Sequence, residues 1–266
     1  MNEYHRMEKN RLTIVKVGGA VVEDDSQCRG LLEAFAAVEG RKILVHGGGR
    51  TASRIASLLG VETKMVDGRR ITDAEMLRVV VMVYGGLVNK QIVARLQALG
   101  TDAVGLTGAD MNIIRSHRRP VVGGIDYGFV GDVDSVDADA LSAVVEKGVV
   151  PVVAPLTHDC HGQLLNTNAD TIASEVAVAM SQLYDVRLVY AFEKAGVLRD
   201  ARDESSVIPH IRVSELADLI GDGTVTGGML PKLQMAAKAV ERGVGEVQIT
   251  CSTDMSPQAG TKIVAG

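Results

Sequence analysis

The sequence predicts an α/β protein in which helices cover a parallel sheet. Short apolar runs rich in Val and Ile alternate along the chain with segments of helical spacing. Ala, Val, Leu and Gly supply most of the core, and aromatic residues make up only 3% of the 266 residues, as is common in helix-covered parallel sheets. A chain of this length holds one large domain or two modest ones, each with a full core.

The individual elements follow from periodicity and from turn residues. Apolar, β-branched runs predict strands at 12–17, 42–46, 101–107, 149–154, 163–165, 187–192 and 246–251. Helical spacing predicts helices at 26–38, 50–59, 73–99, 166–183, 213–220 and 229–242. Thr72-Asp73-Ala74-Glu75 is interpreted as a capping box, and Gly85-Gly86 predict a bend or a close helix contact. The stretch 123–136 mixes Gly, Asp and aromatics and is interpreted as a hairpin or loop.

The charge, cysteine and hydropathy patterns exclude several classes of protein. The net charge is −5, which leaves no basic footprint for nucleic acid. Cys28, Cys160 and Cys251 show no CxxC or metal-ligand spacing and fit reduced thiols. The polar N-terminal segment has no apolar signal region, and we expect no apolar run long enough to span a bilayer. The sequence therefore predicts a cytoplasmic protein that binds neither nucleic acid nor membrane.

Lys16 is the most informative residue, because it lies near the end of an apolar strand and is followed by Gly18-Gly19. A lysine in such a strand must reach water with its long side chain or meet an anion. The run Gly47-Gly48-Gly49 joins the next strand to a helix. Three glycines there allow backbone N–H groups to approach an anion beside the helix N-terminus. The spacing is that of neither a Rossmann fingerprint nor a Walker loop.

Lys232 follows the glycines at 227–228 in the first turn of a predicted helix. A cation opposes the helix dipole at that position, which makes sense if an anion joins it there. Asn166, Asn168 and Asp170 precede another helix, and taken alone they are best interpreted as a capping cluster.

Arg69 and Arg70 follow an Asp-Gly turn. They form either a solvated turn or an arginine fork for a carboxylate. The histidines His46, His158 and His161 show no triad or metal spacing. We interpret His46 as structural and the other two as loop residues, and we predict no metal site on the protein.

Together these motifs resemble the amino acid kinase family, in the order in which that family carries them and over nearly the whole chain. The matching segments are Lys16-Val17-Gly18-Gly19, His46-Gly47-Gly48-Gly49, Arg70-Ile71-Thr72, Gly105-Leu106-Thr107-Gly108, Gly128-Phe129-Val130-Gly131-Asp132-Val133, Asn166-Thr167-Asn168-Ala169-Asp170, Gly228-Met229-Leu230-Pro231-Lys232 and Gly260-Thr261-Lys262-Ile263. Each segment is weak alone, whereas the set is specific.

The resemblance implies a three-layer αβα sandwich around a mostly parallel central sheet. Residues 1–184 would bind the amino-acid substrate and form a homodimer, and residues 185–266 would bind the nucleotide. The implied reaction moves the γ-phosphoryl group of ATP to the side-chain carboxylate of N-acetyl-L-glutamate, in arginine synthesis. Mg²⁺ would be carried on the ATP phosphates.

The resemblance also implies a role for each motif residue. Lys16 and Lys232 would neutralise the transferring phosphoryl group, as phosphoryl transfer requires, and Asp170 would hold both lysines. The residues expected to bind the amino-acid substrate are Gly48, Gly49, Arg70 and Asn166. The residues expected to bind the nucleotide are Gly18, Gly19, Glu193, Lys194, Gly196 and Thr226.

One segment departs from the family pattern. Relatives usually carry Thr/Ser-Asp-Val-x-Gly after the strand that ends at Phe192, whereas this chain reads Phe192-Glu193-Lys194-Ala195-Gly196. The acid and the final glycine are kept, and Lys194 replaces an apolar residue. The nucleotide contacts of this turn therefore stay open.

Three alternatives concern the substrate and the activity. The acceptor is N-acetyl or another N-acyl glutamate, such as N-succinyl. A sibling kinase would act on another carboxylate, on carbamate or on a nucleotide, and Arg70 and Asn166 weigh against the last two. An amino-acid sensor on the same fold would need no phosphoryl clamp, so the presence of Lys16, Asp170 and Lys232 argues against it.

The resemblance also bears on assembly and regulation. Arginine-inhibited relatives carry an extra N-terminal helix that links dimers into a hexamer, and roughly ten polar residues ahead of the first strand are too few for such a helix. We therefore expect a homodimer that arginine does not inhibit.

Overall fold

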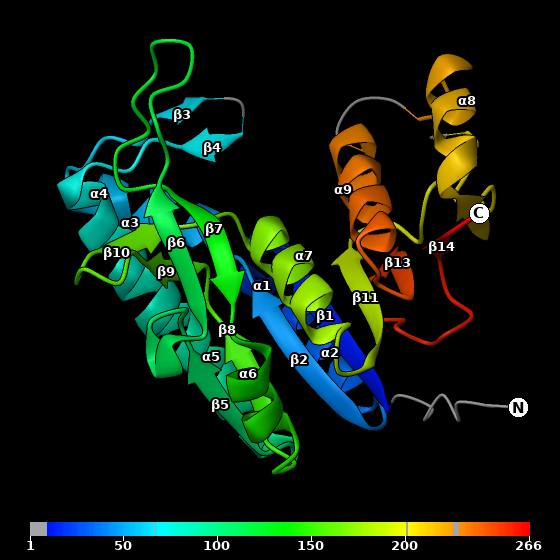
Figure 1. Cartoon of the computed structure of the whole chain (residues 1–266), viewed down its shortest axis with the longest axis horizontal. Coiled ribbons are helices and arrows are strands. Elements are labelled where there is room, and N and C mark those ends of the chain that lie inside the picture. Colours follow the sequence, from blue (N-terminus) through cyan, green and yellow to red (C-terminus); the bar gives the residue numbers. More distant parts are fainter. Residues whose placement is uncertain (1–9, 67, 201, 226–228) are drawn as a thin grey trace, which may run out of the picture.

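A continuous eight-stranded sheet runs through the molecule in the order β12-β14-β13-β11-β1-β2-β8-β5 (Figure 1). The computed structural model describes residues 10–66, 68–200, 202–225 and 229–266. The strands of this sheet are β1 (Arg11–Val17), β2 (Arg41–His46), β5 (Ala103–Leu106), β8 (Val150–Val153), β11 (Asp185–Phe192), β12 (His210–Arg212), β13 (Glu246–Cys251) and β14 (Thr261–Val264). Neighbouring strands are parallel except for β13 and β14, so the prediction of a mostly parallel sheet is confirmed.

Helices cover both faces of this sheet and complete the three layers. Alternate residues of a strand enter different cores: Leu12 and Ile14 pack in one, and Val15 and Val17 in the other. The first core includes α6 (Ala138–Val145), α7 (Ala169–Met180) and α9 (Met229–Glu241). The second includes α1 (Gly19–Glu23), α2 (Asp25–Ala36), α3 (Gly49–Leu58), α4 (Ala74–Val80) and α5 (Asn89–Ala98). Strands buried on both faces explain the continuous apolar runs in the sequence.

Two smaller sheets lie beside the main one, near the top of Figure 1. One has the order β10-β9-β6-β7 and consists of β10 (Leu164–Asn166), β9 (Leu156–His158), β6 (Ile114–Arg118) and β7 (Gly131–Val136). The other is the hairpin of β3 (Met65–Val66) and β4 (Arg69–Arg70). The expected hairpin at 123–136 holds β7, but β6 and β9 were not predicted, because these short strands carry polar residues. His158 therefore belongs to a strand and not to a loop, which corrects that assignment.

The long helix expected at 73–99 differs from the prediction in its N-cap and in the hydrogen-bonding of its middle turns. The Asp73 carboxylate accepts the Met76 N–H at 2.8 Å and is the N-cap, whereas the Thr72 hydroxyl donates to the Arg70 carbonyl. The predicted capping box is therefore wrong. Between α4 and α5 the helix widens into a π-helical stretch, η1 (Val81–Val88), which contains both glycines. A Cβ on Gly85 would lie 3.2 Å from Leu156 Cδ1, so the close contact there is with β9.

The continuous helix Ala74–Ala98 also corrects the expectation about membrane spans. The helix has 25 residues and contains an 18-residue window with a mean hydropathy of 1.3, which is sufficient for a bilayer span by length and composition alone. Half of its apolar window is buried inside the molecule, where the helix packs in the second core. Its hydropathy is therefore that of a core helix of this fold.

Two helices and two strands also differ from expectation. The helix expected from residue 166 begins at Ala169, because Asn166 belongs to β10. The helix expected at 213–220 divides into a 3₁₀ turn, η3 (Val213–Glu215), and α8 (Leu216–Gly221). The strands β12 and β14, at one end of the main sheet, were not predicted, because three or four residues give little periodicity.

Candidate active site

Two glycine turns meet at the carboxyl edge of the sheet. The strands β1 and β2 are parallel neighbours with Val17 opposite His46, so the turns that follow them lie side by side. A Cβ on Gly19 would lie 3.1 Å from the backbone nitrogens of both Gly48 and Gly49. A side chain at Gly19 would therefore push the two turns apart. The N-caps of α1 and α3 are glycines without a side-chain cap bond, which leaves main-chain N–H groups for an anion.

A buried histidine holds the second turn. His46 Nδ1 lies 2.7 Å from the carbonyl oxygen of Gly47, and Asn89 Nδ2 lies 3.1 Å from His46 Nε2. Both bonds are satisfied when Nδ1 carries the proton and donates while Nε2 accepts from the amide. Burial lowers the pKa of His46 to about 4, so the ring is neutral. The structural role predicted for His46 is confirmed.

Lys16 is paired with Asp170 at the start of α7. Lys16 shares its face of β1 with Leu12 and Ile14, which pack against α7, so its side chain is directed toward the N-terminus of that helix. Its Nζ lies 2.6 Å from Asp170 Oδ1, and the two side chains are 8% and 26% exposed. The close contact with this carboxylate fixes the position of the Lys16 ammonium.

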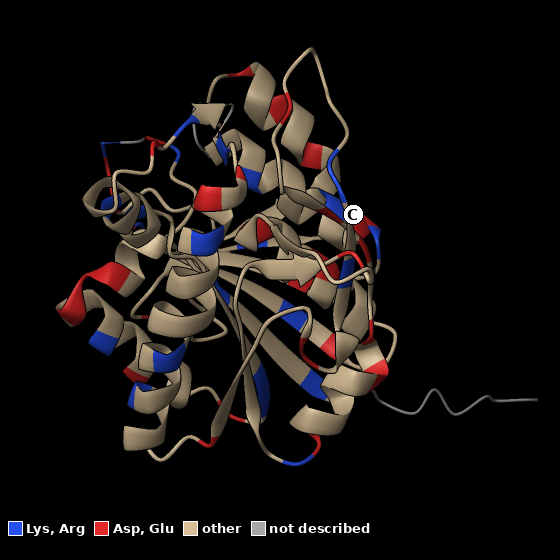
Figure 2. Ribbon diagram, turned by 90° about the vertical axis from the view of Figure 1, so that its left-hand side faces the viewer, with Lys and Arg blue, Asp and Glu red and all other residues tan. Residues whose placement is uncertain are grey.

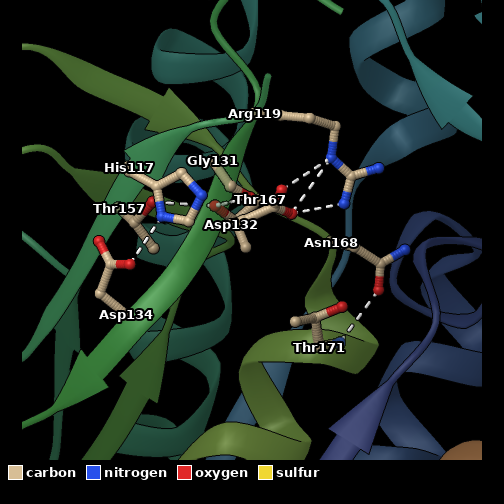
Figure 3. A network of polar contacts seen from close by, with 9 residues as sticks. All are labelled: His117, Arg119, Gly131, Asp132, Asp134, Thr157, Thr167, Asn168 and Thr171. Atoms are coloured by element: carbon tan, nitrogen blue, oxygen red, sulfur yellow. Dashed lines mark hydrogen bonds and ion pairs between the residues drawn. The ribbon is translucent and has the colours of Figure 1, made fainter. Parts of the chain in front are cut away.

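The cap of α7 is Asn168 and not Asp170. Asn168 Oδ1 accepts the N–H groups of Asp170 and Thr171 at 2.8 Å and 3.1 Å, and Figure 3 shows the second of these bonds. The cap position therefore does not account for Asp170, whose carboxylate is directed to Lys16 instead.

Lys232 approaches the same place from the first turn of α9. Burial lowers the pKa of its ammonium, and the nearby charge of Lys16 lowers it further, while Asp170 and Glu193 act in the opposite direction. Among the described residues Lys232 has no ion pair. The expectation that Asp170 holds both lysines is therefore met at contact distance for Lys16 alone.

Two cavities adjoin beside Lys16. The larger, of about 590 Å³, and the smaller, of about 210 Å³, both include Lys16 and Gly19 in their walls. The walls of the larger cavity also include the residues expected to bind the nucleotide, namely Gly18, Glu193, Lys194 and Gly196, together with Lys232. The walls of the smaller include those expected to bind the amino acid, namely Gly48, Gly49, Arg70 and Asn166, together with Asp170. Thr226, also expected at the nucleotide, lies outside the described residues.

The smaller cavity has a buried arginine in its wall. Arg70 Nη2 donates to the Gly49 carbonyl at 2.8 Å and to Ser53 Oγ at 3.0 Å. Asn166 Nδ2 donates to Thr72 Oγ1 at 2.9 Å, and that hydroxyl donates to the Arg70 carbonyl at 3.0 Å. Arg70 is thus buried and hydrogen-bonded, and the solvated-turn interpretation is wrong for it.

A second arginine in this wall, Arg69, was weighed with Arg70 as an arginine fork but was not among the residues expected to bind the substrate. Arg69 is partly buried, and its pKa is lowered by burial and then by the charge of Arg119. Arg119 Nε donates to both carboxylate oxygens of Asp132 at 3.1 Å, as Figure 3 shows. Because that carboxylate is taken, Arg69 forms no ion pair within the described part of the chain. The signal in the sequence that could have identified Arg69 as a site residue was its position directly beside Arg70.

Acidic and basic residues are interspersed over the molecule, as Figure 2 shows. Within the described ranges, no group of three or more His, Cys, Asp and Glu side chains is arranged to hold a metal ion. The charged side chains in the cavity walls are those of Lys16, Arg69, Arg70, Asp170, Glu193, Lys194 and Lys232.

An αβα sandwich with two adjoining cavities, a lysine in the wall that they share, a second lysine in the larger cavity and two helix N-termini without a side-chain cap is suited to two ligands with an anionic group between them. Residues 11–251 match the model of the Amino acid kinase family, and the chain belongs to that family.

Two relatives show how far the likeness extends along the sequence. Acetylglutamate kinase of Bacteroides fragilis is 59% identical over 255 residues, which cover 96% of this chain and 97% of that protein. Acetylglutamate kinase of Methanopyrus kandleri is 42% identical over 242 residues, covering 90% and 94%.

Two solved structures share the fold. Carbamate kinase from Giardia lamblia bound to AMP-PNP has a TM-score of 0.65 at 15% identity, over 98% of this chain and 99% of that chain. N-acetylglutamate synthase from Neisseria gonorrhoeae, complexed with coenzyme A and N-acetyl-glutamate, has a TM-score of 0.81 at 22% identity, over 98% of this chain and 60% of that chain. At these identities the likeness establishes the fold.

Proposed function

We propose that this protein transfers the γ-phosphoryl group of ATP to the side-chain carboxylate of N-acetyl-L-glutamate, in arginine biosynthesis. The observation that carries the proposal is the pair Lys16 and Lys232, because both line the larger cavity and Lys16 also lines the smaller one. The name shared by relatives of 59% and 42% identity supports the choice of substrate.

The larger cavity is the proposed ATP site. Its volume of about 590 Å³ suits a nucleotide, and Glu193, Lys194 and Gly196 are the proposed contacts. A contact from Thr226 remains a prediction. Mg²⁺ is proposed to arrive on the ATP phosphates as part of the substrate.

The transfer itself needs no proton movement. A carboxylate oxygen of the acceptor attacks the γ-phosphorus, the bond from that phosphorus to the bridging β–γ oxygen breaks, and ADP leaves with the electron pair. Lys16 and Lys232 neutralise the charge on the transferring group, and backbone N–H groups near Gly19 and Gly48 bind its oxygens. Asp170 fixes the ammonium of Lys16.

The smaller cavity is the proposed amino-acid site. Arg70 and Asn166 are proposed to bind the α-carboxylate and its neighbourhood, and Gly48 and Gly49 line the pocket. The guanidinium carries five N–H donors, and its existing bonds to Gly49 and Ser53 fix its orientation before the substrate arrives. The proposed site is therefore organised in advance.

A hydroxylamine trap tests this function. The protein is incubated with Mg-ATP, hydroxylamine and one acceptor at a time: N-acetylglutamate, N-succinylglutamate, aspartate or carbamate. An acyl phosphate reacts with hydroxylamine to give a hydroxamate. Hydroxamate formation with N-acetylglutamate is expected, and its absence with every acceptor would contradict the proposal and favour a sensor.

One observation favours the alternative acceptor, N-succinylglutamate. Arg69 lies in the wall of the acceptor cavity beside Arg70 and has no carboxylate partner in the described part of the chain. A second substrate carboxylate would supply that partner. In the same assay, a preference for the succinyl compound that disappears in Arg69→Met would select this alternative. An unchanged preference for the acetyl compound would reject it.

We also propose a cytoplasmic homodimer, in which residues 1–184 contribute the amino-acid site and the dimer contact and residues 185–266 contribute the nucleotide site. Met82 and Leu87 in η1 are 53% and 41% exposed although they are apolar, which supports a second copy packing on that helix. Light scattering of the wild type and of Met82→Glu checks this. A wild-type monomer would contradict it.

A further inference from the structure

The aromatic ring of Phe192 contacts the ammonium group of Lys232. The Lys232 Nζ is 3.6 Å from the centroid of the Phe192 ring, and the Lys16 Nζ is 5.7 Å from it. Phe192 is the last residue of β11 and its ring stacks on that of Tyr190, with centroids 6.2 Å apart and planes 8° apart. Tyr190 lies opposite Lys16 in the parallel pairing of β1 and β11. Stacking on Tyr190 therefore holds the Phe192 ring in place, and the ring presents one face to the ammonium groups of Lys16 and Lys232.

The two lysines are held in different ways. Lys16 has a carboxylate at 2.6 Å, whereas Lys232 has the face of an aromatic ring and no ion pair within the described ranges. An aromatic face attracts a cation through the ring quadrupole but does not neutralise its charge. A phosphate group that enters the larger cavity therefore finds an ammonium that no carboxylate of the described residues holds at ion-pair distance.

We propose that Phe192 is a positioning residue, whose ring face holds the Lys232 ammonium where the two cavities adjoin until a nucleotide phosphate binds it. The inference rests on the proposed function, because it takes Lys232 as the cation that meets the phosphoryl group. It explains how two ammonium groups that repel each other are kept at one site in the absence of ligand. It also gives a role to the aromatic residue at the start of the 192–196 turn.

An NMR experiment tests the contact without reference to activity. Protein labelled at lysine Cε is recorded alone and with Mg-AMP-PNP, and Lys232→Met assigns the signal. The ring current of Phe192 is expected to shift the Lys232 methylene protons upfield, and this shift is expected to vanish in Phe192→Leu and to persist in Phe192→Tyr. Mg-AMP-PNP is expected to reduce it in the wild type. An ordinary Lys232 shift in the free wild type, or an upfield shift unchanged in Phe192→Leu, would overturn the proposal.

Kinetics of a fluorinated protein test the consequence. Trifluorophenylalanine at position 192 keeps the shape of the ring and weakens its quadrupole, so kcat is expected to fall by about tenfold while the KM of the amino-acid substrate stays the same. The same substitution at Phe35 is the control, because that ring faces Lys42 at 5.3 Å in another part of the molecule. An equal loss at Phe35, or no loss at position 192, would contradict the inference.

The failure of this inference is distinguishable from the failure of the proposed function. If Lys232→Met is inactive while the fluorinated ring at position 192 has no effect, the role of Phe192 alone is rejected. If Lys232→Met retains normal kcat, the proposed role of Lys232 is rejected, and with it the inference that depends on that role.

Discussion

The two cavities adjoin at Lys16 and Gly19 but are built in different ways. In the smaller cavity the polar groups are hydrogen-bonded to one another. Arg70 donates to the Gly49 carbonyl, and Asn166 donates to the Thr72 hydroxyl, which in turn donates to the Arg70 carbonyl. In the larger cavity Glu193 and Lys194 are exposed and form no hydrogen bond or ion pair with a described residue. A pocket organised in advance discriminates between ligands, whereas an open one adapts. We therefore expect selectivity on the amino-acid side and charge stabilisation at the junction.

The largest effect is expected at the junction itself. Lys16→Met and Lys232→Met should each lower kcat by about a hundredfold or more, the scale for losing one transition-state donor. The KM values should move far less, because the interaction strengthens as charge develops. Steady-state kinetics with both substrates measure this. Lys238→Met is the control, because Lys238 is an exposed lysine on the same helix as Lys232. Near-normal kcat in folded Lys16→Met or folded Lys232→Met would remove the substituted lysine from the site.

The next effect separates the amino-acid side from the junction. Arg70→Ala should raise the KM of the amino-acid substrate by roughly tenfold to a hundredfold, the scale of a lost charge-assisted hydrogen bond, with a smaller change in kcat. Arg70→Lys should restore only part, because the bidentate fork is lost. Arg78→Ala, which removes an exposed arginine paired with Glu75, is the control. An unchanged KM in folded Arg70→Ala would show that this arginine serves only the turn it contacts.

A third prediction distinguishes the two residues at the start of α7. Asp170→Asn should lower kcat by about tenfold, because Lys16 loses its charged partner, while the melting temperature stays close to that of the wild type. Asn168→Ala should lower the free energy of unfolding by about 1 kcal/mol, because the helix loses its cap. Thermal melts and kinetics of both variants provide the comparison. Normal kcat in Asp170→Asn would leave that carboxylate without a catalytic consequence.

The smallest effect concerns the histidine behind the second turn. Its pKa is about 4 in the folded protein, below the ordinary value near 6.5 in the unfolded chain. The unfolded chain therefore binds the extra proton between these values, and stability is lost as the pH falls through that range. From pH 7 to 5.5 the loss due to His46 should be about 1 kcal/mol.

Denaturant unfolding of the wild type and of His46→Gln at several pH values measures this loss. The variant should show a shallower fall in stability between pH 7 and 5.5, whereas the exposed His210→Gln should follow the wild type. Equal slopes in all three proteins would mean that His46 is not buried in its neutral form.

Local sequence signals predicted the main sheet because its strands are buried on both faces. β1, β2, β8, β11 and β13 are rich in Val, Ile and Leu, and most of their residues are buried; such segments are recognisable without tertiary context. The short strands β6 and β9 pair mainly with β7 and β10 and meet each other at Arg115 and His158, and they are too short to give a periodic signal. For the same reason β12 and β14 were not predicted.

The sequence by itself determined which residues stand at the strand ends and in which order. Lys16 before its glycines and the three glycines after β2 are local features, so their meeting at one sheet edge followed from the parallel order of the strands. The glycines were predictable because close approach of two backbones excludes a side chain.

Only the tertiary structure decided which partner each charged group meets. Three polar residues near the start of α7 were equal candidates for its cap, and packing assigned Asn168 to the cap and Asp170 to Lys16. The contact of Lys232 with Phe192 joins α9 to β11 across 40 positions of the chain. Hydrogen bonds and cation–ring contacts depend on distances of a few ångströms, and spacing along the sequence fixes such distances only within one helix or strand.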